Sequence, residues 1–192
     1  MSLYLFIPFL IATAILLATP GPTILLVVSY ALAHGRGVAL AVVGGVILGD
    51  LLAMSATLIG LGVVMTASAS LFTVMKWAGA AYLAWMGWRM IRSAGRATAD
   101  LAKVAGKSKG AAFRDSALVT LLNPKSIGFF VAFVPQFIDP AAPFTPQFTV
   151  MIATFVGLGG VNAFAYALLA ATLRSKVACL LYTSPSPRDP VS

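Results

Sequence analysis

Five long apolar runs follow one another along this chain, separated by short polar or charged segments. They cover roughly residues 3–33, 38–64, 71–91, 117–138 and 148–173. About 20 consecutive apolar residues are enough for a helix to cross the hydrocarbon core of a bilayer. The pattern therefore predicts an all-α polytopic membrane protein with five transmembrane helices.

Two of these runs, the first and the fourth, are interrupted by proline near their middles. The interruptions lie at 19–22, which reads Thr-Pro-Gly-Pro, and at 123–125, which reads Asn-Pro-Lys. Proline removes an amide donor and clashes with the preceding turn, so we expect a broken helix at each place. Irregular backbone at membrane depth is tolerated where it is buried in protein or lines a cavity. A matched pair of broken helices in two halves of a chain is typical of a transport site.

The two halves also resemble each other beyond the proline breaks. In each half the run after the broken helix carries a polar residue behind glycine, Asp50 in one and Asn162 in the other. We interpret the chain as a three-plus-three inverted repeat, with 3–91 as the first repeat and 117–173 as an incomplete second one. The alternative is that two prolines merely kink two unrelated helices. A sixth span is not visible, because the chain is polar and proline-rich from Thr183 onward. We expect the tail at 179–192 to be disordered and foreign to the single transporter domain at 1–178.

Charge is distributed unevenly over the connections between the runs. The chain is 60% hydrophobic and 9% charged with a net charge of +8, and six of its 13 basic residues lie between the third and fourth runs. Basic loops stay in the cytoplasm, so 92–116 is predicted to be a cytoplasmic loop, with the N-terminus outside and the protein in the bacterial inner membrane. Binding of this loop to anionic lipid remains an alternative to a role in orientation alone. Nucleic-acid binding is not favoured, because juxtamembrane loops account for the basic charge.

The chain has few of the residues that disulfides, metal centres and enzyme active sites require. The chain has one cysteine, Cys179, and one histidine, His34, which we expect to be solvated in a cytoplasmic turn. This excludes a disulfide framework and argues against a metal centre, a cofactor and an enzymatic function. The N-terminal run has no basic leader and exceeds the length of a signal peptide, so we expect it to be the first span.

Asp50 is the most informative residue, because it lies about 18 Å along the second run, near the middle of the bilayer. A charge at that depth is costly and is a functional-site hypothesis by default. Lys125 lies beside the second break and would bind the carboxylate of a substrate or act as counter-ion of Asp50. A purely structural Asp50–Lys125 ion pair is the alternative. The predicted substrate-binding or proton-coupling residues are Asp50, Lys125, Asn123, Pro22, Gly21 and Asn162, with Lys76 and Gly49 as weaker candidates.

Small residues recur every four positions in the second run, and among them Gly45 and Gly49 form a GxxxG pair. Such a face lets neighbouring backbones approach closely. Packing within the chain is the preferred interpretation, and a homodimer contact is the alternative.

These motifs occur in an order that resembles the LysE/RhtB family of amino-acid exporters. The resemblance spans roughly 3–177. The matching residues are Thr19, Pro20, Gly21, Pro22, Gly35, Gly37, Gly45, Gly49 and Asp50; Lys76, Gly79, Tyr82, Leu83 and Gly87; and Asn123, Pro124, Lys125, Phe129, Phe130, Phe133, Pro135, Gln136 and Phe137. The resemblance implies efflux of neutral or basic amino acids, of the homoserine, threonine, leucine or lysine kind, by proton-coupled antiport.

A free amino acid carries an ammonium and a carboxylate, and the predicted site offers a partner for each. Asp50 would meet the ammonium or carry a proton, since burial favours the neutral form of a carboxyl group. The helix N-termini at the two breaks would offer free amides to a carboxylate. A structural or lipid-interacting membrane protein, and a carrier of another small solute, remain the alternatives.

Overall fold

The computed structural model of the chain describes residues 1–92, 104 and 106–182. Within that part all regular structure is helical. The helices are α1 (Leu3–Ala18), α2 (Pro22–His34), α3 (Arg36–Ala67), α4 (Ala69–Arg92), α6 (Lys109–Leu121), α7 (Pro124–Ala132), the 3₁₀ turn η1 (Val134–Phe137) and α8 (Phe144–Tyr182). The predicted all-α membrane fold is confirmed.

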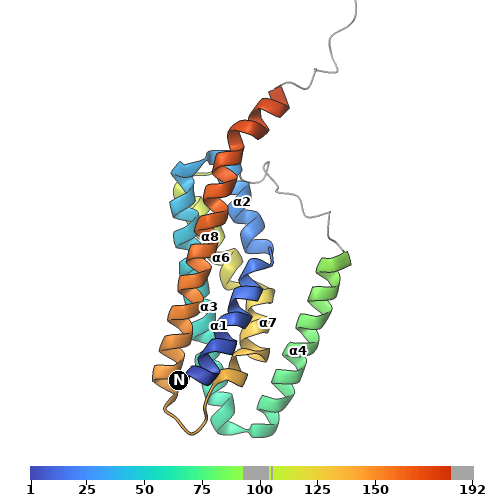
Figure 1. Cartoon of the computed structure of the whole chain (residues 1–192), viewed down its shortest axis with the longest axis vertical. Coiled ribbons are helices and arrows are strands. Elements are labelled where there is room, and N and C mark those ends of the chain that lie inside the picture. Colours follow the sequence, from blue (N-terminus) through green and yellow to red (C-terminus); the bar gives the residue numbers. More distant parts are fainter. Residues whose placement is uncertain (93–103, 105, 183–192) are drawn as a thin grey trace, which may run out of the picture.

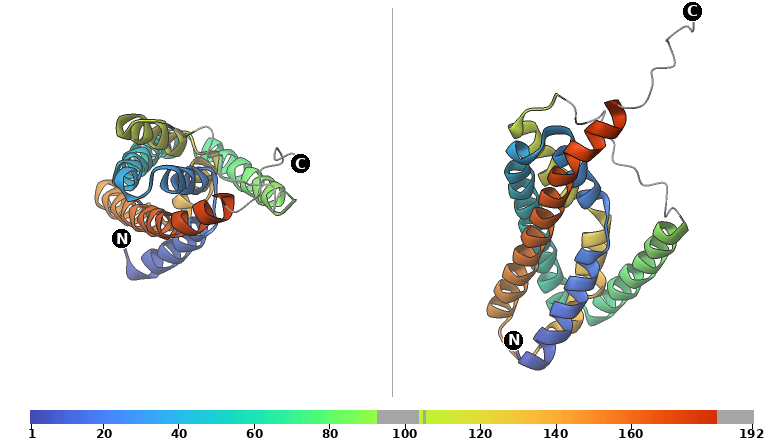
Figure 2. Two further views of the ribbon diagram at one scale, coloured as in Figure 1. Left: turned by 90° about the horizontal axis from the view of Figure 1, so that it is seen from above. Right: turned by 45° about the horizontal axis from the view of Figure 1, so that its top comes forward.

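The helices run up and down through one elongated bundle (Figure 1). The N-terminus, the α3–α4 turn and the α7–α8 loop lie at one end, and the α2–α3 turn lies at the other. The N-terminus and the α2–α3 turn therefore lie at opposite ends of the bundle, and the side that faces the cytoplasm stays a prediction from charge. Helix α4 leans away from the other helices (Figure 2), and it packs mainly on α7.

Both predicted breaks are confirmed. Helix α1 ends at Ala18 and α2 begins at Pro22 with a bend of 50° between them. Helix α6 ends at Leu121, and α7 begins at Pro124 behind Asn123. Proline occupies the first position of the second half-helix in both cases, where its missing amide would have had no partner in the helix anyway.

Three of the described helices are long and apolar enough to cross a membrane, and the bent α1–α2 pair counts as a fourth. The three are Arg36–Val64, Lys109–Phe137 and Phe144–Arg174. Helix α4, at the place of the predicted third span, has 24 residues but is not among them. Its glycines, tryptophans and basic residues dilute the apolar content of the run.

The fourth span begins earlier than predicted. The sequence places its start near 117, but α6 starts at Lys109, where the Ser108 side chain accepts a hydrogen bond from the Ala111 amide. Asp115, which belongs to the predicted loop, is instead helical, and its carboxylate accepts from the Tyr30 hydroxyl and the Lys107 ammonium. The loop prediction for 92–116 is therefore wrong from Lys109 onward, and its residues 93–103 and 105 lie outside the described residues.

Two further predictions concern the ends of helices. His34 is not a freely solvated side chain, because its Nδ1 is buried without a hydrogen-bond partner in the described structure and its ring lies 5.8 Å from that of Tyr30. Helix α8 continues through 179–182, the start of the predicted disordered tail. The rest of that tail, 183–192, lies outside the described residues.

The GxxxG face of α3 packs within the chain. A Cβ on Gly45 would lie 2.2 Å from the Phe113 carbonyl oxygen, and one on Gly49 would lie 2.6 Å from that of Ala117. Both glycines are therefore required by the close approach of α6 to α3, and this face is not free for a homodimer contact.

The apolar core has two clusters of buried side chains, one toward each end of the bundle. One gathers around Val27, Val42 and Ala167, and the other around Phe9, Met54, Phe130 and Phe155. In α3 the first cluster ends at Val46 and the second begins at Ala53, so Asp50 lies between them. The two helix breaks lie at the same level, so a polar layer separates the two clusters.

Candidate functional site

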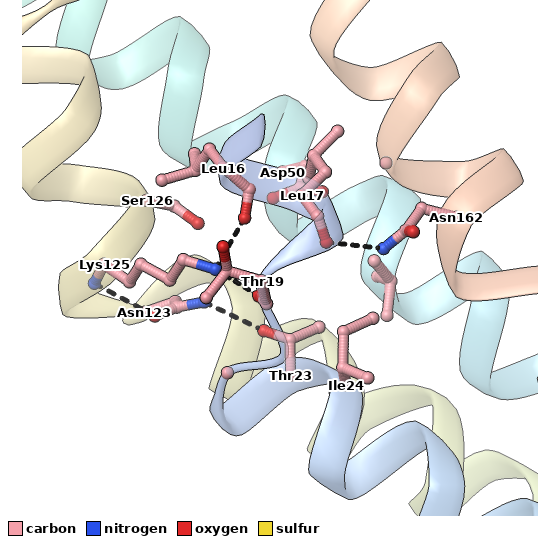
Figure 3. Close-up of a pocket in the computed structure, with 13 residues that line it drawn as sticks. Leu16, Leu17, Thr19, Thr23, Ile24, Asp50, Asn123, Lys125, Ser126 and Asn162 are labelled. Carbon is pink, nitrogen blue, oxygen red and sulfur yellow. Dashed lines mark hydrogen bonds between the residues drawn. The ribbon is translucent and has the colours of Figure 1, made fainter. Parts of the chain in front are cut away.

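A cavity of about 40 Å³ occupies this polar layer. Five helices and the α1–α2 break contribute to it (Figure 3). Its lining residues are Leu16, Leu17, Thr19, Gly21, Thr23, Ile24, Val46, Asp50, Asn123, Lys125, Ser126, Gly159 and Asn162. The structure thus brings together five of the predicted site residues: Asp50, Lys125, Asn123, Gly21 and Asn162.

Three predicted residues lie elsewhere. Pro22 starts α2 but is exposed and does not line the cavity. Gly49 is packed against α6. Lys76 lies half-buried on α4, outside the cavity.

Lys125 is bound by the end of a broken helix. Its ammonium donates hydrogen bonds to the carbonyl oxygens of Leu16 and Thr19, at the C-terminus of α1. These carbonyls are among those a helix end leaves without an intrahelical donor, and the negative end of the helix dipole favours a cation there. The Lys125 side chain is only 9% exposed, so the α1 carbonyls supply the partners that this buried charge needs.

Asp50 has no such partner. Its side chain is 4% exposed, and within the described residues it accepts no hydrogen bond and forms no ion pair. The structural Asp50–Lys125 ion pair, the alternative interpretation of these residues, is therefore absent in the described structure, although both side chains line one cavity. Helix α8 leaves room for the carboxyl group, since a Cβ on Gly159 would lie 2.7 Å from Asp50 Oδ2.

Two asparagine side chains form hydrogen bonds that connect the helix breaks to neighbouring helices. Asn123 caps α7 by accepting from the Lys125 amide at 3.0 Å, and its own amide group donates to Thr23 Oγ1 at 3.1 Å. On the other side of the cavity, Asn162 Nδ2 donates to the Leu17 carbonyl at 3.1 Å (Figure 3). The carbonyl end of α1 is thus held from both α7 and α8.

The start of α2 offers hydrogen-bond donors to the same space. Its first turn contains Thr23 and Ile24, whose backbone amides have no carbonyl one turn earlier to bond. Both residues line the cavity. The site therefore combines a buried carboxyl group, a buried ammonium group and the positive end of a half-helix.

Sequence reasoning missed several members of this site. Thr23 directly follows Pro-Gly-Pro, so its position at the start of a half-helix could have identified it. Gly159 stands three positions before Asn162, which places both near one face of α8. The backbone carbonyls of Leu16, Leu17 and Thr19 have no side-chain signal, and nothing in the sequence points to them.

The chain is similar in sequence to a known protein family and to several individual membrane proteins. The model of a family described as LysE type translocator matches residues 14–182. An uncharacterized membrane protein of Vibrio cholerae serotype O1 is 35% identical over 173 residues, which cover 90% of this chain and 84% of that protein. The homoserine/homoserine lactone efflux protein of Salmonella typhimurium is 34% identical over 163 residues, covering 84% of this chain and 78% of that protein.

A leucine efflux protein of Klebsiella pneumoniae is 28% identical over 134 residues, covering 70% of this chain and 63% of that protein. No solved structure matches the chain.

Proposed function

This chain belongs to the LysE type translocator family, as its motifs predicted, and from that premise we propose that it exports amino acids from the bacterial cytoplasm in exchange for protons. Two of its relatives are named as efflux proteins for homoserine or homoserine lactone and for leucine. Their names favour amino-acid substrates for this chain. The charge distribution favours an inner-membrane protein with the α2–α3 turn and the 92–116 segment in the cytoplasm.

One observation carries the proposal: Asp50 and Lys125 are both buried and line the same cavity without pairing with each other. A zwitterionic amino acid needs an acceptor for its ammonium and a donor for its carboxylate. Asp50 is the acceptor without a partner. Lys125, together with the amides of Thr23 and Ile24, forms the donor side.

Proton coupling follows from competition for the Asp50 carboxylate. A proton and the ammonium group of a substrate both neutralise this buried charge, and only one of them can do so at a time. Binding of the substrate on the cytoplasmic side would release the proton there. Release of the substrate outside would leave the carboxyl group to be protonated again from outside.

The test uses membrane vesicles turned inside out, so that the cytoplasmic face is accessible, with an imposed proton gradient. A panel of radiolabelled amino acids is offered, and the control vesicles lack the protein. We expect gradient-dependent accumulation of at least one neutral or basic amino acid, abolished by a protonophore. No accumulation of any member of the panel would refute the proposal.

A further inference from the structure

A second cavity lies beside the polar one, between α1, α4 and α7, and it opens to the surface of the bundle, since Ile15 and Phe133 in its lining are 65% and 39% exposed. Its volume is about 350 Å³. Its lining residues are Ala12, Ile15, Leu16, Thr19, Leu83, Met86, Gly87, Lys125, Phe129 and Phe133. Almost all are apolar, and Lys125 is the single charged residue of this lining.

The two cavities are neighbours, because Leu16, Thr19 and Lys125 line both of them. The Lys125 ammonium bonds the Leu16 and Thr19 carbonyls, and these residues border both cavities. A ligand held by its charged groups beside Lys125 can therefore extend an apolar portion into the second cavity.

The two cavities also differ in the size of the group that each can hold. One buried water needs about 10–15 Å³ of such space, so the polar cavity has room for a few waters and not for a whole amino acid. Small-molecule sites usually measure about 300–1,000 Å³. The apolar cavity alone is within that range.

We propose that the apolar cavity between α1, α4 and α7 is the subsite for the substrate side chain, and that the exported amino acids are neutral ones with apolar side chains. This inference rests on the proposed function, because it assumes that the polar cavity binds the ammonium and carboxylate groups. Aliphatic side chains gain from leaving water for such surroundings. A lysine side chain would bring a second ammonium next to Lys125 into an apolar space, which is strongly unfavourable.

Gly87 gives a direct way to fill this subsite. It lines the cavity from α4, and a Cβ added there meets no atom within 4 Å. Gly87→Leu therefore places an apolar side chain in the space without displacing backbone. Gly157→Leu on α8 is the matched control, because that glycine is exposed, lines neither cavity and also has open space around it. Both changes raise helix propensity alike.

The measurement is kcat/KM for leucine, alanine and lysine in the inside-out vesicles. Wild-type protein should transport leucine more efficiently than lysine by at least about tenfold, because a buried unpaired ammonium costs more than the roughly 1.4 kcal/mol that a tenfold change represents. Burial of a leucine side chain corresponds to about 10- to 100-fold in affinity, so Gly87→Leu should lower the leucine-to-alanine ratio of kcat/KM by about tenfold or more. Gly157→Leu should leave that ratio at the wild-type value.

Met86→Ala provides a second variant that changes the cavity in the opposite direction. It removes a side chain from the lining, so it should raise phenylalanine transport relative to leucine. The subsite proposal is overturned if wild-type protein transports leucine and alanine but neither variant changes the ratios, or if lysine is transported as well as leucine.

Other occupants give different results. A lipid acyl chain in the cavity would make Gly87→Leu affect leucine and alanine equally. A second copy of the chain docked there would make Gly87→Leu change the oligomeric state in detergent. Either result overturns the subsite while amino-acid export stands, whereas a wild-type protein that transports no amino acid refutes the export proposal itself.

Discussion

The variant Asp50→Asn distinguishes between two roles of the Asp50 carboxyl group, one in transport and one in stabilising the fold. Asp50 is buried, and in the described structure it has neither a hydrogen bond nor an ion pair to lose. Asparagine has nearly the same volume, so the variant creates no cavity and leaves no partner unsatisfied. Since one hydrogen bond contributes about 1 kcal/mol net, the free energy of unfolding should change by less than about 1 kcal/mol.

Transport should respond very differently. An amide group neither carries a proton nor compensates an ammonium, and leaving one member of a buried charge pair alone costs about 3–5 kcal/mol. That corresponds to more than a hundredfold loss of substrate binding. Proton-driven uptake of leucine into inside-out vesicles and thermal unfolding in detergent measure the two effects on the same preparation.

Asp115→Asn is the matched control, because the same exchange is made at a carboxylate that does have partners. Asp115 accepts from the Tyr30 hydroxyl and from Lys107, whose side chain is 41% exposed. Loss of this partly solvated pair should lower stability by about 1 kcal/mol, with transport retained. If Asp50→Asn keeps proton-driven transport, or destabilises the protein by several kcal/mol, then Asp50 is a structural residue and the reasoning is refuted.

Three further variants test buried contacts elsewhere in the bundle as well as at the site. Lys125→Met removes the donor to the Leu16 and Thr19 carbonyls, and each buried carbonyl left without a partner costs about 1–3 kcal/mol; its melting temperature should fall well below that of Asp50→Asn. Gly49→Leu would force α6 away from α3 and should yield no monodisperse protein in gel filtration, whereas Gly60→Leu, with nothing within 4 Å of its Cβ, should behave as wild type. Gln147→Ala removes the bonds from its amide to the carbonyls of Asp139, Ala142 and Pro143, so limited proteolysis should cleave the α7–α8 loop faster.

The sequence predicted those features of the fold that depend on local chemistry. Proline acts on its own turn, so both helix breaks could be located to within a residue or two. Asp50 could be placed near the middle of its helix, because a helix has a fixed rise per residue. The GxxxG face could be assigned to close packing, because glycines spaced by four in an apolar helix usually allow a neighbouring backbone to approach.

The features that the sequence did not predict depend on partners far away along the chain. The carboxylate of Asp115 is bound by the hydroxyl of Tyr30, 85 residues earlier, and no local pattern points to that contact. The partners of Lys125 are two backbone carbonyl groups, and the side chains of a sequence do not indicate which carbonyl groups are free to bond. The cavity between α1, α4 and α7 lies where α4 leans away from the other helices (Figure 2), and the apolar pattern of α4 does not determine that arrangement.

The partner of Lys125 changes what the two buried charges can do. If Lys125 were paired with Asp50, a substrate would have to break a buried ion pair before binding, at a cost of about 3–5 kcal/mol. With the ammonium held by the carbonyl end of α1, the Asp50 carboxyl group has no protein partner to be displaced. Only an interrupted helix exposes free carbonyls at this depth, since a continuous one bonds them internally. The break between α1 and α2 therefore keeps the two charges in one cavity without letting them neutralise each other.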